Sequence, residues 1–280
     1  MEVINTISQI RKTIKEQVQK GKSIGFVPTM GALHQGHISL INRAREENDL
    51  VVCSIFVNPT QFDNPEDLKK YPRTLETDCT LLEAAGCDYV FAPTAEEMYP
   101  TLPKLSIDFG NLERVMEGKF RNGHFSGVGT VVAKLFHIVN PDRAYFGLKD
   151  LQQVAVLRRL VNDLSFDLDL IPCPIVREKD GLAMSSRNRR LSDDARKIAP
   201  QVHIALQKAK ELLIQGKSST EVKTIIEEHL QFFPELKAEY FEISDFDNLE
   251  PIPAMNNEGQ TAICTAIYLD GVRLIDNIVF

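Results

Sequence analysis

The chain has 280 residues, of which 43% are hydrophobic and 25% charged, and its net charge is -7, from 32 basic and 39 acidic residues. These proportions are those of a globular protein and argue against a disordered chain. The negative net charge disfavours broad binding to nucleic acid or anionic membranes, so an anionic substrate would need a local cluster of positive groups.

The cysteines and the first segment indicate a cytoplasmic protein. The five cysteines include no C-x-x-C pair, and an odd number in a long chain fits a reduced protein better than a disulfide scaffold. Residues 1–22 predict a mixed amphipathic helix without the long apolar run of a secretory signal. No apolar run approaches the length of a membrane span.

Strands and helices alternate through the first part of the chain. Strands are predicted at residues 22–29, 49–58, 87–93, 142–147 and 168–176, and helices at 36–48, 74–87, 126–140 and 151–164. Parallel strands need crossover connections, so this alternation predicts a doubly wound, Rossmann-like parallel α/β sheet over residues 1–176. Its ligand should bind outside the carboxyl ends of the strands.

The pattern changes beyond residue 176. Helices are predicted at residues 193–217 and 218–233, then a strand at 238–246 and a β-hairpin at 261–280. The hairpin turn is Asp270-Gly271, a strong two-residue turn signal. Helices followed by antiparallel strands predict a smaller α+β domain over residues 177–280, which we expect to act as a lid.

The segment PTMGALHQGH, residues 28–37, joins the first predicted strand to a helix. Its glycines allow close approach of a ligand, and the helix N-terminus that follows favours an anion. His34 and His37 add hydrogen-bond donors, so phosphate binding is favoured over a turn with two surface histidines. A zinc site is disfavoured because the sequence has neither H-E-x-x-H nor a nearby cysteine pair.

Polar residues also follow the next strand. Asn58 and Gln61 carry amides that suit a substrate with carboxylate and hydroxyl groups, although alone they favour a capped polar turn. Asp78 in the next helix is either an exposed carboxylate or a metal ligand.

Lys149 follows a later strand, where lysine is a common point-charge ligand of phosphate, and Asp150 beside it is a candidate helix cap. Gln152 and Gln153 point in different directions on a helix, so at most one of them meets the same ligand.

Two loops also carry polar and basic residues. Residues 177–192 indicate a mobile loop with hydroxyl and guanidinium donors at the domain boundary, and residues 116–128 favour a solvated basic turn.

Six motifs in one order resemble a known family. PTMGALHQGH resembles the H-x-G-H element of the class I nucleotidyltransferase superfamily, and KDGLAMSSRN is similar to its second phosphate loop. Six segments in this order resemble motifs of the pantothenate synthetase (pantoate–β-alanine ligase) family. They are VPTMGALHQGH, SIFVNPTQF, YPRT, EGKFRNGHFSGV, PDRAYFGLKD and KDGLAMSSRN.

The resemblance implies an ATP-dependent ligase that condenses pantoate with β-alanine through a pantoyl-adenylate, with Mg²⁺ as cofactor, in a cytoplasmic homodimer. The residues that it implies for ATP are Met30, Gly31, Ala32, Leu33, His34, Gln35, Gly36, His37, Gly147, Leu148, Lys149, Asp150, Val176, Met184, Ser185, Ser186 and Arg187. The groups implied to offset phosphate charge are His34, His37, Lys149, Ser185, Ser186 and Arg187. The residues assigned to pantoate and β-alanine are Gln61, Gln153 and Asn58, and Asp78 matches an acidic position near the metal.

Two positions depart from the family pattern. Asn122 stands where proline is usual, and Leu148 stands where glutamate is commoner. Activation of the acid as an adenylate needs no protein nucleophile, which agrees with the absence of a convincing triad in the sequence. The alternatives are another H-x-G-H nucleotidyltransferase that leaves the nucleotide on its product and a regulatory nucleotide-binding module without chemistry.

Overall fold

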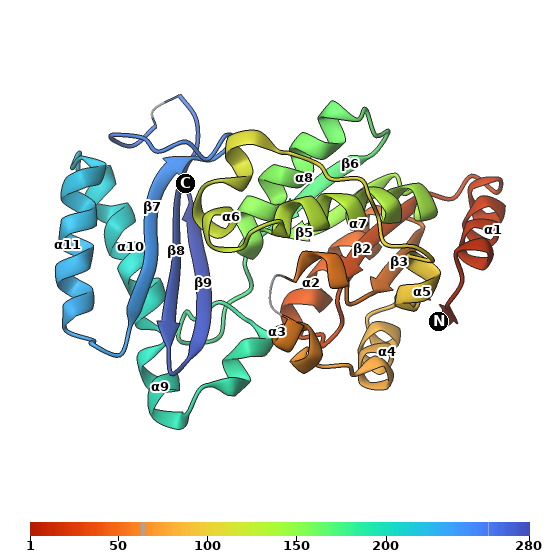
Figure 1. Cartoon of the computed structure of the whole chain (residues 1–280), viewed down its shortest axis with the longest axis horizontal. Helices are drawn as coiled ribbons and strands as arrows, with labels where there is room; N and C mark the ends of the chain where they lie inside the picture. The colour runs from red at the N-terminus through yellow and green to blue at the C-terminus, as the bar shows by residue number, and fades with distance from the viewer. Residues whose placement is uncertain (63–64, 257) are drawn as a thin grey trace.

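The structure, a computed structural model, describes residues 1–62, 65–256 and 258–280. Its larger part is a six-stranded parallel sheet in the order β1-β4-β3-β2-β5-β6 (Figure 1). The strands are β1 (Glu2–Ile4), β2 (Ile24–Thr29), β3 (Leu50–Ile55), β4 (Tyr89–Phe91), β5 (Arg143–Gly147) and β6 (Asp169–Cys173). The predicted parallel α/β sheet is confirmed. The strand order reverses at β2, which lies between β3 and β5, and ligands bind at such switch points.

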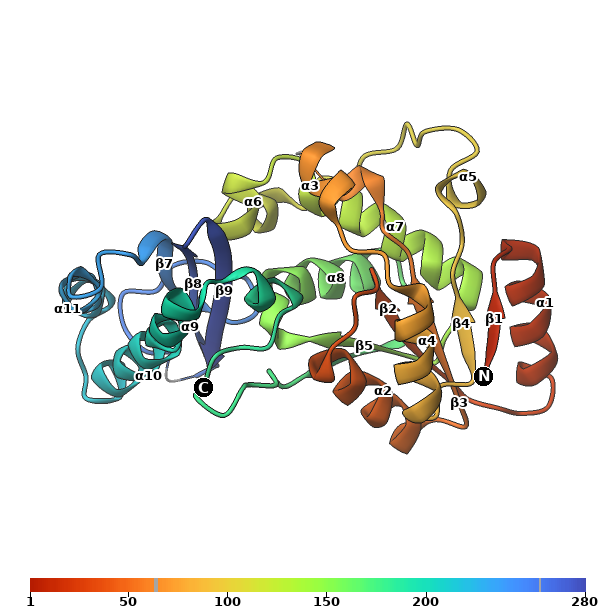
Figure 2. The same cartoon turned by 90° about the horizontal axis from the view of Figure 1, so that it is seen from below.

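Helices cover both faces of this sheet (Figure 2). One face packs against α1 (Ile7–Val18), α7 (His124–Val139) and α8 (Leu151–Asp163), and the other against α2 (Gln35–Glu47) and α4 (Leu75–Ala84). Shorter helices are α3 (Pro65–Lys70), α5 (Ala95–Met98) and α6 (Met116–Phe120). Single 3-10 turns are η1 (Pro59–Gln61), η2 (Gly110–Glu113), η3 (Leu148–Asp150) and η4 (Ser186–Arg190). Because both faces are covered, the central strands are apolar on both sides, as their continuous hydrophobic runs predict.

The prediction of one helix over residues 1–22 is wrong at its start. Residues Glu2–Ile4 form β1, an edge strand that pairs in parallel with β4. Ile4 is fully buried, and the helix begins only after Thr6, whose side chain accepts the N–H of Gln9. A strand of three residues is too short to show an alternating pattern, so its pairing is decided by the tertiary structure.

The smaller part is a three-stranded antiparallel sheet in the order β7-β8-β9. Its elements are α9 (Asp193–Ile198), α10 (Gln201–Ile214), α11 (Ser219–Gln231), β7 (Lys237–Asp245), β8 (Thr261–Leu269) and β9 (Val272–Val279). The hairpin is confirmed, with φ of 52° at Asp270 and 69° at Gly271. The helix predicted over residues 193–217 is divided before Pro200–Gln201, because proline cannot continue the hydrogen bonding of the helix before it.

A partly buried ion-pair network joins the two parts. Arg273 on β9 donates to both carboxylate oxygens of Glu117 on α6, at 2.7 and 2.8 Å, and to Glu239 on β7. Tyr240 donates to the same Glu117 at 2.9 Å. Burial opposes ionisation of Glu117, but the hydrogen bonds and charge of Arg273 outweigh it and lower its pKa. The division of the chain at residue 176 stays a prediction.

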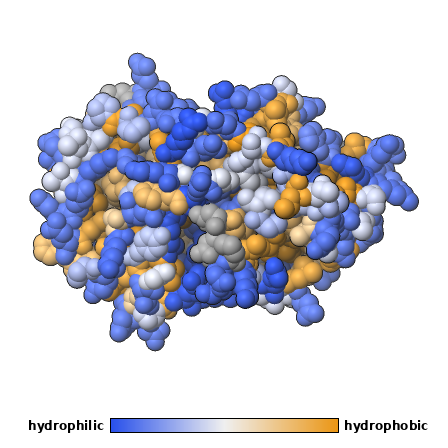
Figure 3. All heavy atoms as spheres, viewed as in Figure 1, coloured by the Kyte–Doolittle hydropathy of each residue, from blue (hydrophilic) through white to orange (hydrophobic). Residues whose placement is uncertain are grey.

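The surface is mostly hydrophilic on the face seen in Figure 3, with apolar patches over both parts. Among the residues that the structure describes, no helix is long and apolar enough to cross a membrane.

Helix α7 approaches the segment after β3 very closely at Gly127. A methyl group there would lie 2.3 Å from the carbonyl oxygen of Thr60, and the Gly127 carbonyl accepts the side-chain amide of Asn58 at 3.2 Å. The absence of a side chain therefore lets the helix hold the turn that carries Gln61.

We predict that Gly127→Ala lowers the free energy of unfolding by about 1–3 kcal/mol, because overpacking forces the helix and the turn apart. Urea unfolding measures this. The matched control is Gly147→Ala, where no atom lies within 4 Å of the added methyl group, and it should change stability by less than about 0.5 kcal/mol. Equal stability of the two variants would contradict the close approach.

Candidate functional site

A cleft opens at the carboxyl ends of β2 and β5, at the switch point of the large sheet. Its cavity volume is about 190 Å³, and small-molecule sites are commonly found at the switch points of α/β sheets. It is lined by residues that follow β2, β5 and β6, by the loop of Met184–Arg187 and by Tyr71. The predicted residues that they bring together are Met30, His34, Gly36, His37, Gly147, Lys149, Asp150, Gln153, Val176, Met184, Ser185, Ser186 and Arg187.

The turn after β2 is held by a buried carboxylate. Asp78 on α4 is 1% exposed and accepts the backbone N–H groups of Ala32 at 2.9 Å and Leu33 at 2.8 Å. It also accepts the hydroxyl of Thr74 at 3.1 Å. Gly31 and Ala32 both have positive φ, so this turn is a strained path that the carboxylate stabilises. The expectation that Asp78 is an exposed carboxylate is wrong, and its position favours shaping the turn over binding a metal directly.

The two imidazoles of the H-x-G-H element are fixed by backbone donors. The Nδ1 atom of His34 accepts the N–H of Gly36 at 3.1 Å, and the Nδ1 atom of His37 accepts the N–H of His34 at 3.3 Å. An accepting Nδ1 places the hydrogen of a neutral ring on Nε2. Burial, the rings' mutual proximity and Lys149 lower the pKa of His37 to about 3, and burial with Lys149 and Arg189 lowers the pKa of His34. Both rings are therefore neutral N–H donors at physiological pH.

Lys149 enters the cleft from the turn after β5. Its ammonium lies 3.9 Å from the carboxylate of Asp150, and its side chain is only 20% exposed. Enclosure in the cleft opposes ionisation of Asp150, but the positive charges of Lys149, Arg187 and Arg121 outweigh it, so the pKa of Asp150 is below its ordinary value. Gly147 has an ordinary φ of −74° and no atom near its missing Cβ, so open space faces the backbone there.

The loop that carries Met184 and Arg187 is anchored rather than irregular. Met184 donates its N–H to the carbonyl of Val176 at 3.0 Å, and the hydroxyl of Ser185 accepts the N–H of Arg187 at 3.2 Å. Asn188 donates to the carbonyl of Ala183 at 3.0 Å. These contacts turn the predicted mobile loop into a short bridge and a 3-10 turn whose polar groups face the cleft.

Asn58 does not reach the cleft, contrary to its expected role in substrate binding. It is 1% exposed, and its oxygen accepts the hydroxyls of Thr60 and Tyr99, each at 3.0 Å. Its nitrogen donates to the Gln61 side chain at 3.1 Å and to Gly127 at 3.2 Å. Because every polar group of the amide has a protein partner, Asn58 orients Gln61.

Gln61 lies behind Met30, with its amide nitrogen 3.0 Å from the Met30 sulfur. Gln153 lines the cleft, whereas Gln152 is buried and bonds to backbone groups of α6 and of the segment before it. The expectation that only one of these two glutamines faces a ligand thus agrees with their positions.

The remaining predicted ATP residues lie away from the main cleft. Ala32 and Leu33 face a neighbouring pocket beyond Arg187, and the Gln35 side chain is exposed. Leu148 packs its side chain against the apolar core. Gly31 contributes its positive φ to the turn.

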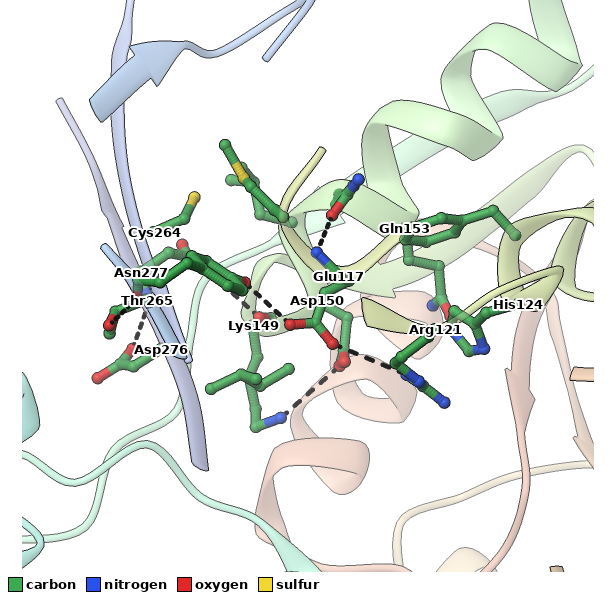
Figure 4. Close-up of a pocket in the computed structure, with 16 residues that line it drawn as sticks. Glu117, Arg121, His124, Lys149, Asp150, Gln153, Cys264, Thr265, Asp276 and Asn277 are labelled. Carbon is green, nitrogen blue, oxygen red and sulfur yellow. Dashed lines mark hydrogen bonds and ion pairs between the residues drawn. The ribbon is translucent and has the colours of Figure 1, made fainter. Parts of the chain in front are cut away.

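A second, smaller pocket continues from the cleft and contains residues that the sequence did not indicate (Figure 4). It shares Lys149, Asp150 and Gln153 with the cleft. Its other polar groups include Glu117, Arg121, His124, Tyr240, Thr265, Asp276 and Asn277. Arg121 and His124 belong to the loop that favoured a solvated basic turn, and His124 is instead buried, with Nδ1 2.9 Å from the Gln61 carbonyl. Thr265 lies within β8, and Asp276 and Asn277 lie within β9, where the sequence carries no motif.

Neutral imidazoles, a lysine and a hydroxyl-rich loop around a strand-to-helix turn define an α/β protein with a phosphate-binding site at its switch point. Comparison with known proteins narrows this class. The family model described as pantoate-beta-alanine ligase matches residues 2–279. The pantothenate synthetase of Cytophaga hutchinsonii is 50% identical over 99% of this chain and 98% of its own length. That of Fervidobacterium nodosum is 50% identical over 100% of this chain and 99% of its own.

Solved structures agree. The pantothenate synthetase of Thermus thermophilus has a TM-score of 0.92 at 44% identity, covering 99% of both chains. The pantoate-beta-alanine ligase of Francisella tularensis, solved with beta-gamma ATP and beta-alanine, has a TM-score of 0.81 at 38% identity, covering 100% of this chain and 97% of its own. The chain belongs to the pantoate–β-alanine ligase family.

The lowered pKa values of the site histidines predict a loss of stability in acid. The unfolded chain binds protons at these histidines below a pH of about 6.5, whereas folded His37 remains neutral to about pH 3. Stability therefore falls as the pH is lowered from about 6.5 towards 4. In His37→Gln the slope of unfolding free energy against pH should be smaller by up to about 1.4 kcal/mol per pH unit.

Urea unfolding between pH 4 and 7 measures the slope. His137→Gln is the matched control, since His137 lies on the exposed side of α7. An unchanged slope in His37→Gln would show that His37 binds protons in the folded protein as it does in the unfolded chain, and that its pKa is not lowered.

Proposed function

We propose that this protein condenses pantoate with β-alanine at the cost of ATP, giving pantothenate, AMP and pyrophosphate through an enzyme-bound pantoyl-adenylate. Family membership and the ATP- and β-alanine-bound relative support this reaction. The observation that carries it is the convergence of His34, His37 and Lys149 with the loop of Met184–Arg187 on one cleft, beside Gln153.

The chemistry has two displacement steps. A pantoate carboxylate oxygen attacks the α-phosphorus of ATP, and the bond to pyrophosphate breaks. The β-alanine amine then attacks the acyl carbon, AMP leaves with the electron pair of the C–O bond, and the nitrogen loses a proton. Neither step needs a protein nucleophile, so catalysis comes from positioning and from stabilising charge on phosphate oxygens.

The site supplies that stabilisation without much positive charge. The Nε2–H groups of His34 and His37 donate hydrogen bonds as neutral groups, and no imidazolium has to be desolvated when a phosphate enters. Lys149 and Arg187 add formal charge, and the hydroxyls of Ser185 and Ser186 add donors. The loss of one such donor typically costs about 3–4 kcal/mol of transition-state stabilisation.

The other cleft residues suit the organic parts of the substrates. Gln153, with Gln61 behind Met30, offers amide donors and acceptors for the hydroxyl and carboxylate groups of pantoate. Val176 lines the cleft and would contact the adenine side of the nucleotide. The smaller part of the chain, residues 177–280, would act as a lid that shields the adenylate from water.

Mg²⁺ is implied by the family, and the cleft fits it only in part. Over the described ranges, no group of three or more His, Cys, Asp or Glu side chains is arranged to hold a metal. Mg²⁺ is commonly bound through substrate phosphates and one or two carboxylates, and the half-exposed carboxylate of Asp150 is available in the cleft, whereas that of Asp78 is committed to backbone donors. The ion would neutralise phosphate charge.

The family resemblance also implies a cytoplasmic homodimer, and we extend both properties to this chain as proposals. Sedimentation velocity of the purified protein would test the oligomeric state.

Isotope exchange between pyrophosphate and ATP distinguishes the adenylate route from its alternatives. We expect exchange that requires pantoate and does not require β-alanine, because only the first step forms pyrophosphate. A nucleotidyltransferase that keeps the nucleotide on its product would release no AMP when β-alanine is added. Binding of ATP without any exchange would indicate the regulatory module instead.

Removal of one phosphate donor should greatly slow turnover and leave the fold intact. We predict that Lys149→Ala and His37→Ala lower kcat by about 10²–10³-fold, because each removes a donor to the phosphate oxygens. The fold should remain intact because both side chains line the cleft and do not belong to the hydrophobic core. Steady-state kinetics and thermal unfolding measure both effects, and Lys12→Ala on the exposed side of α1 is the control. Near-normal kcat in either variant would remove that residue from the site.

A further inference from the structure

The end of the last strand makes a contact with the catalytic turn that the proposed chemistry does not use. The side-chain nitrogen of Asn277 on β9 donates to the carbonyl oxygens of Leu148 at 2.8 Å and of Lys149 at 3.0 Å. Asn277 is 3% exposed, so this amide is a buried, two-pronged donor. Figure 4 shows it on β9, on the side of the pocket that faces Lys149.

The turn that receives these hydrogen bonds decides where Lys149 points. Residues Leu148–Asp150 form a single 3-10 turn between β5 and α8. The neighbouring Gly147 has no side chain to pack, and no atom lies within 4 Å of its Cβ position. Leu148 packs against the apolar core, and the two carbonyl contacts from β9 add hydrogen-bonded anchoring at Leu148 and at Lys149 itself. Such anchoring matters for rate because a misplacement of about 1 Å can cost about 10²-fold.

Asn277 is itself held rigidly. Its backbone N–H donates to the carboxylate of Asp276 at 2.7 Å, and its carbonyl accepts from Arg177 at 3.0 Å. Arg177 makes a two-point ion pair with Asp276 at 2.6 and 3.0 Å, with Asp276 only 3% exposed. Buried bidentate pairs of this kind have specific geometry.

The same arginine reaches the second phosphate-binding segment. Arg177 donates to the carbonyl of Gly181 at 3.0 Å, and Arg177 and Ala183 form the bridge that leads into Met184–Arg187. One strand end thus holds both the turn of Lys149 and the base of the loop that faces it across the cleft.

We propose that Asn277 is a positioning residue of the ligase reaction, which fixes the turn of Lys149 so that the ammonium meets the phosphates of the bound nucleotide. The expected effect of Asn277 on kcat rests on the proposed function. The effect of Asn277 on nucleotide binding can be measured whether or not that function is correct.

Asn277→Ala and Asn277→Ser test the proposal, each alone and combined with Lys149→Ala. Asn277→Ala removes both donors, and Asn277→Ser keeps a smaller hydroxyl that can donate once. We expect Asn277→Ala to lower kcat and weaken the binding of β,γ-methylene-ATP by about tenfold or more, with a smaller loss in Asn277→Ser. In the Lys149→Ala background either substitution should change both quantities by less than about twofold, because the group that it positions is gone.

The control is Asp247→Ala, which removes an ion pair between α8 and the smaller part of the chain, 2.8 Å from Arg158 and outside the cleft. It should leave kcat and nucleotide affinity within about twofold of the wild type, and thermal unfolding compares its stability with that of the Asn277 variants.

Three results would overturn the proposal. The first is an equal loss of kcat and nucleotide affinity in the presence and absence of the Lys149 side chain. The second is a fall in Tm with unchanged kcat and nucleotide affinity, and the third is failure of both Asn277 variants to fold. Each of these would indicate that the Asn277 amide has a purely structural role. If the wild-type protein showed no pantoate-dependent exchange, the proposed function would fail. The affinities of the single and combined variants for β,γ-methylene-ATP, measured by calorimetry, would still decide whether Asn277 acts through Lys149.

Discussion

The site depends on one buried carboxylate that binds backbone N–H groups. Asp78 holds the turn after β2, where two consecutive residues have positive φ, and thereby sets where α2 begins. Because His34 is the N-cap of that helix and His37 lies in its first turn, the direction of both imidazoles follows from this contact. An acidic residue in a helix, distant in sequence from the histidines, thus positions the turn that carries them.

The positive groups that suit an anionic ligand are gathered in the cleft and do not dominate the whole surface. The chain carries a net charge of −7, yet the cleft presents N–H donors, a lysine and an arginine to its ligand. In the reaction that we propose, neutral imidazoles fixed through Nδ1 would donate to phosphate oxygens without the cost of burying an imidazolium. The same burial lowers the pKa of both histidines, so we expect the neutrality of the site and the loss of stability in acid to have one physical origin.

The smaller sheet completes the site rather than merely covering it. Arg273 reaches Glu117, and Asn277 reaches the turn of Lys149, so β9 contacts both α6 and the turn before α8. These bonds are partly buried and specifically oriented, which favours a single arrangement of the contacts on this side of the cleft. Movement that admits substrates would then be concentrated in segments without such bonds.

The sequence by itself determined the parallel α/β class, the strand-to-helix phosphate element, the basic turn of Lys149 and the hairpin, because apolar periodicity, glycine, proline and Asp-Gly act over a few neighbouring residues. It also carried the motifs that identify the family. Only the tertiary structure decided that residues 2–4 pair as a strand, that Asp78 is buried, that Asn58 orients Gln61, and that Asn277 meets Lys149. Each of these depends on which distant segments fold together, and a pattern within one segment holds no information about its partner.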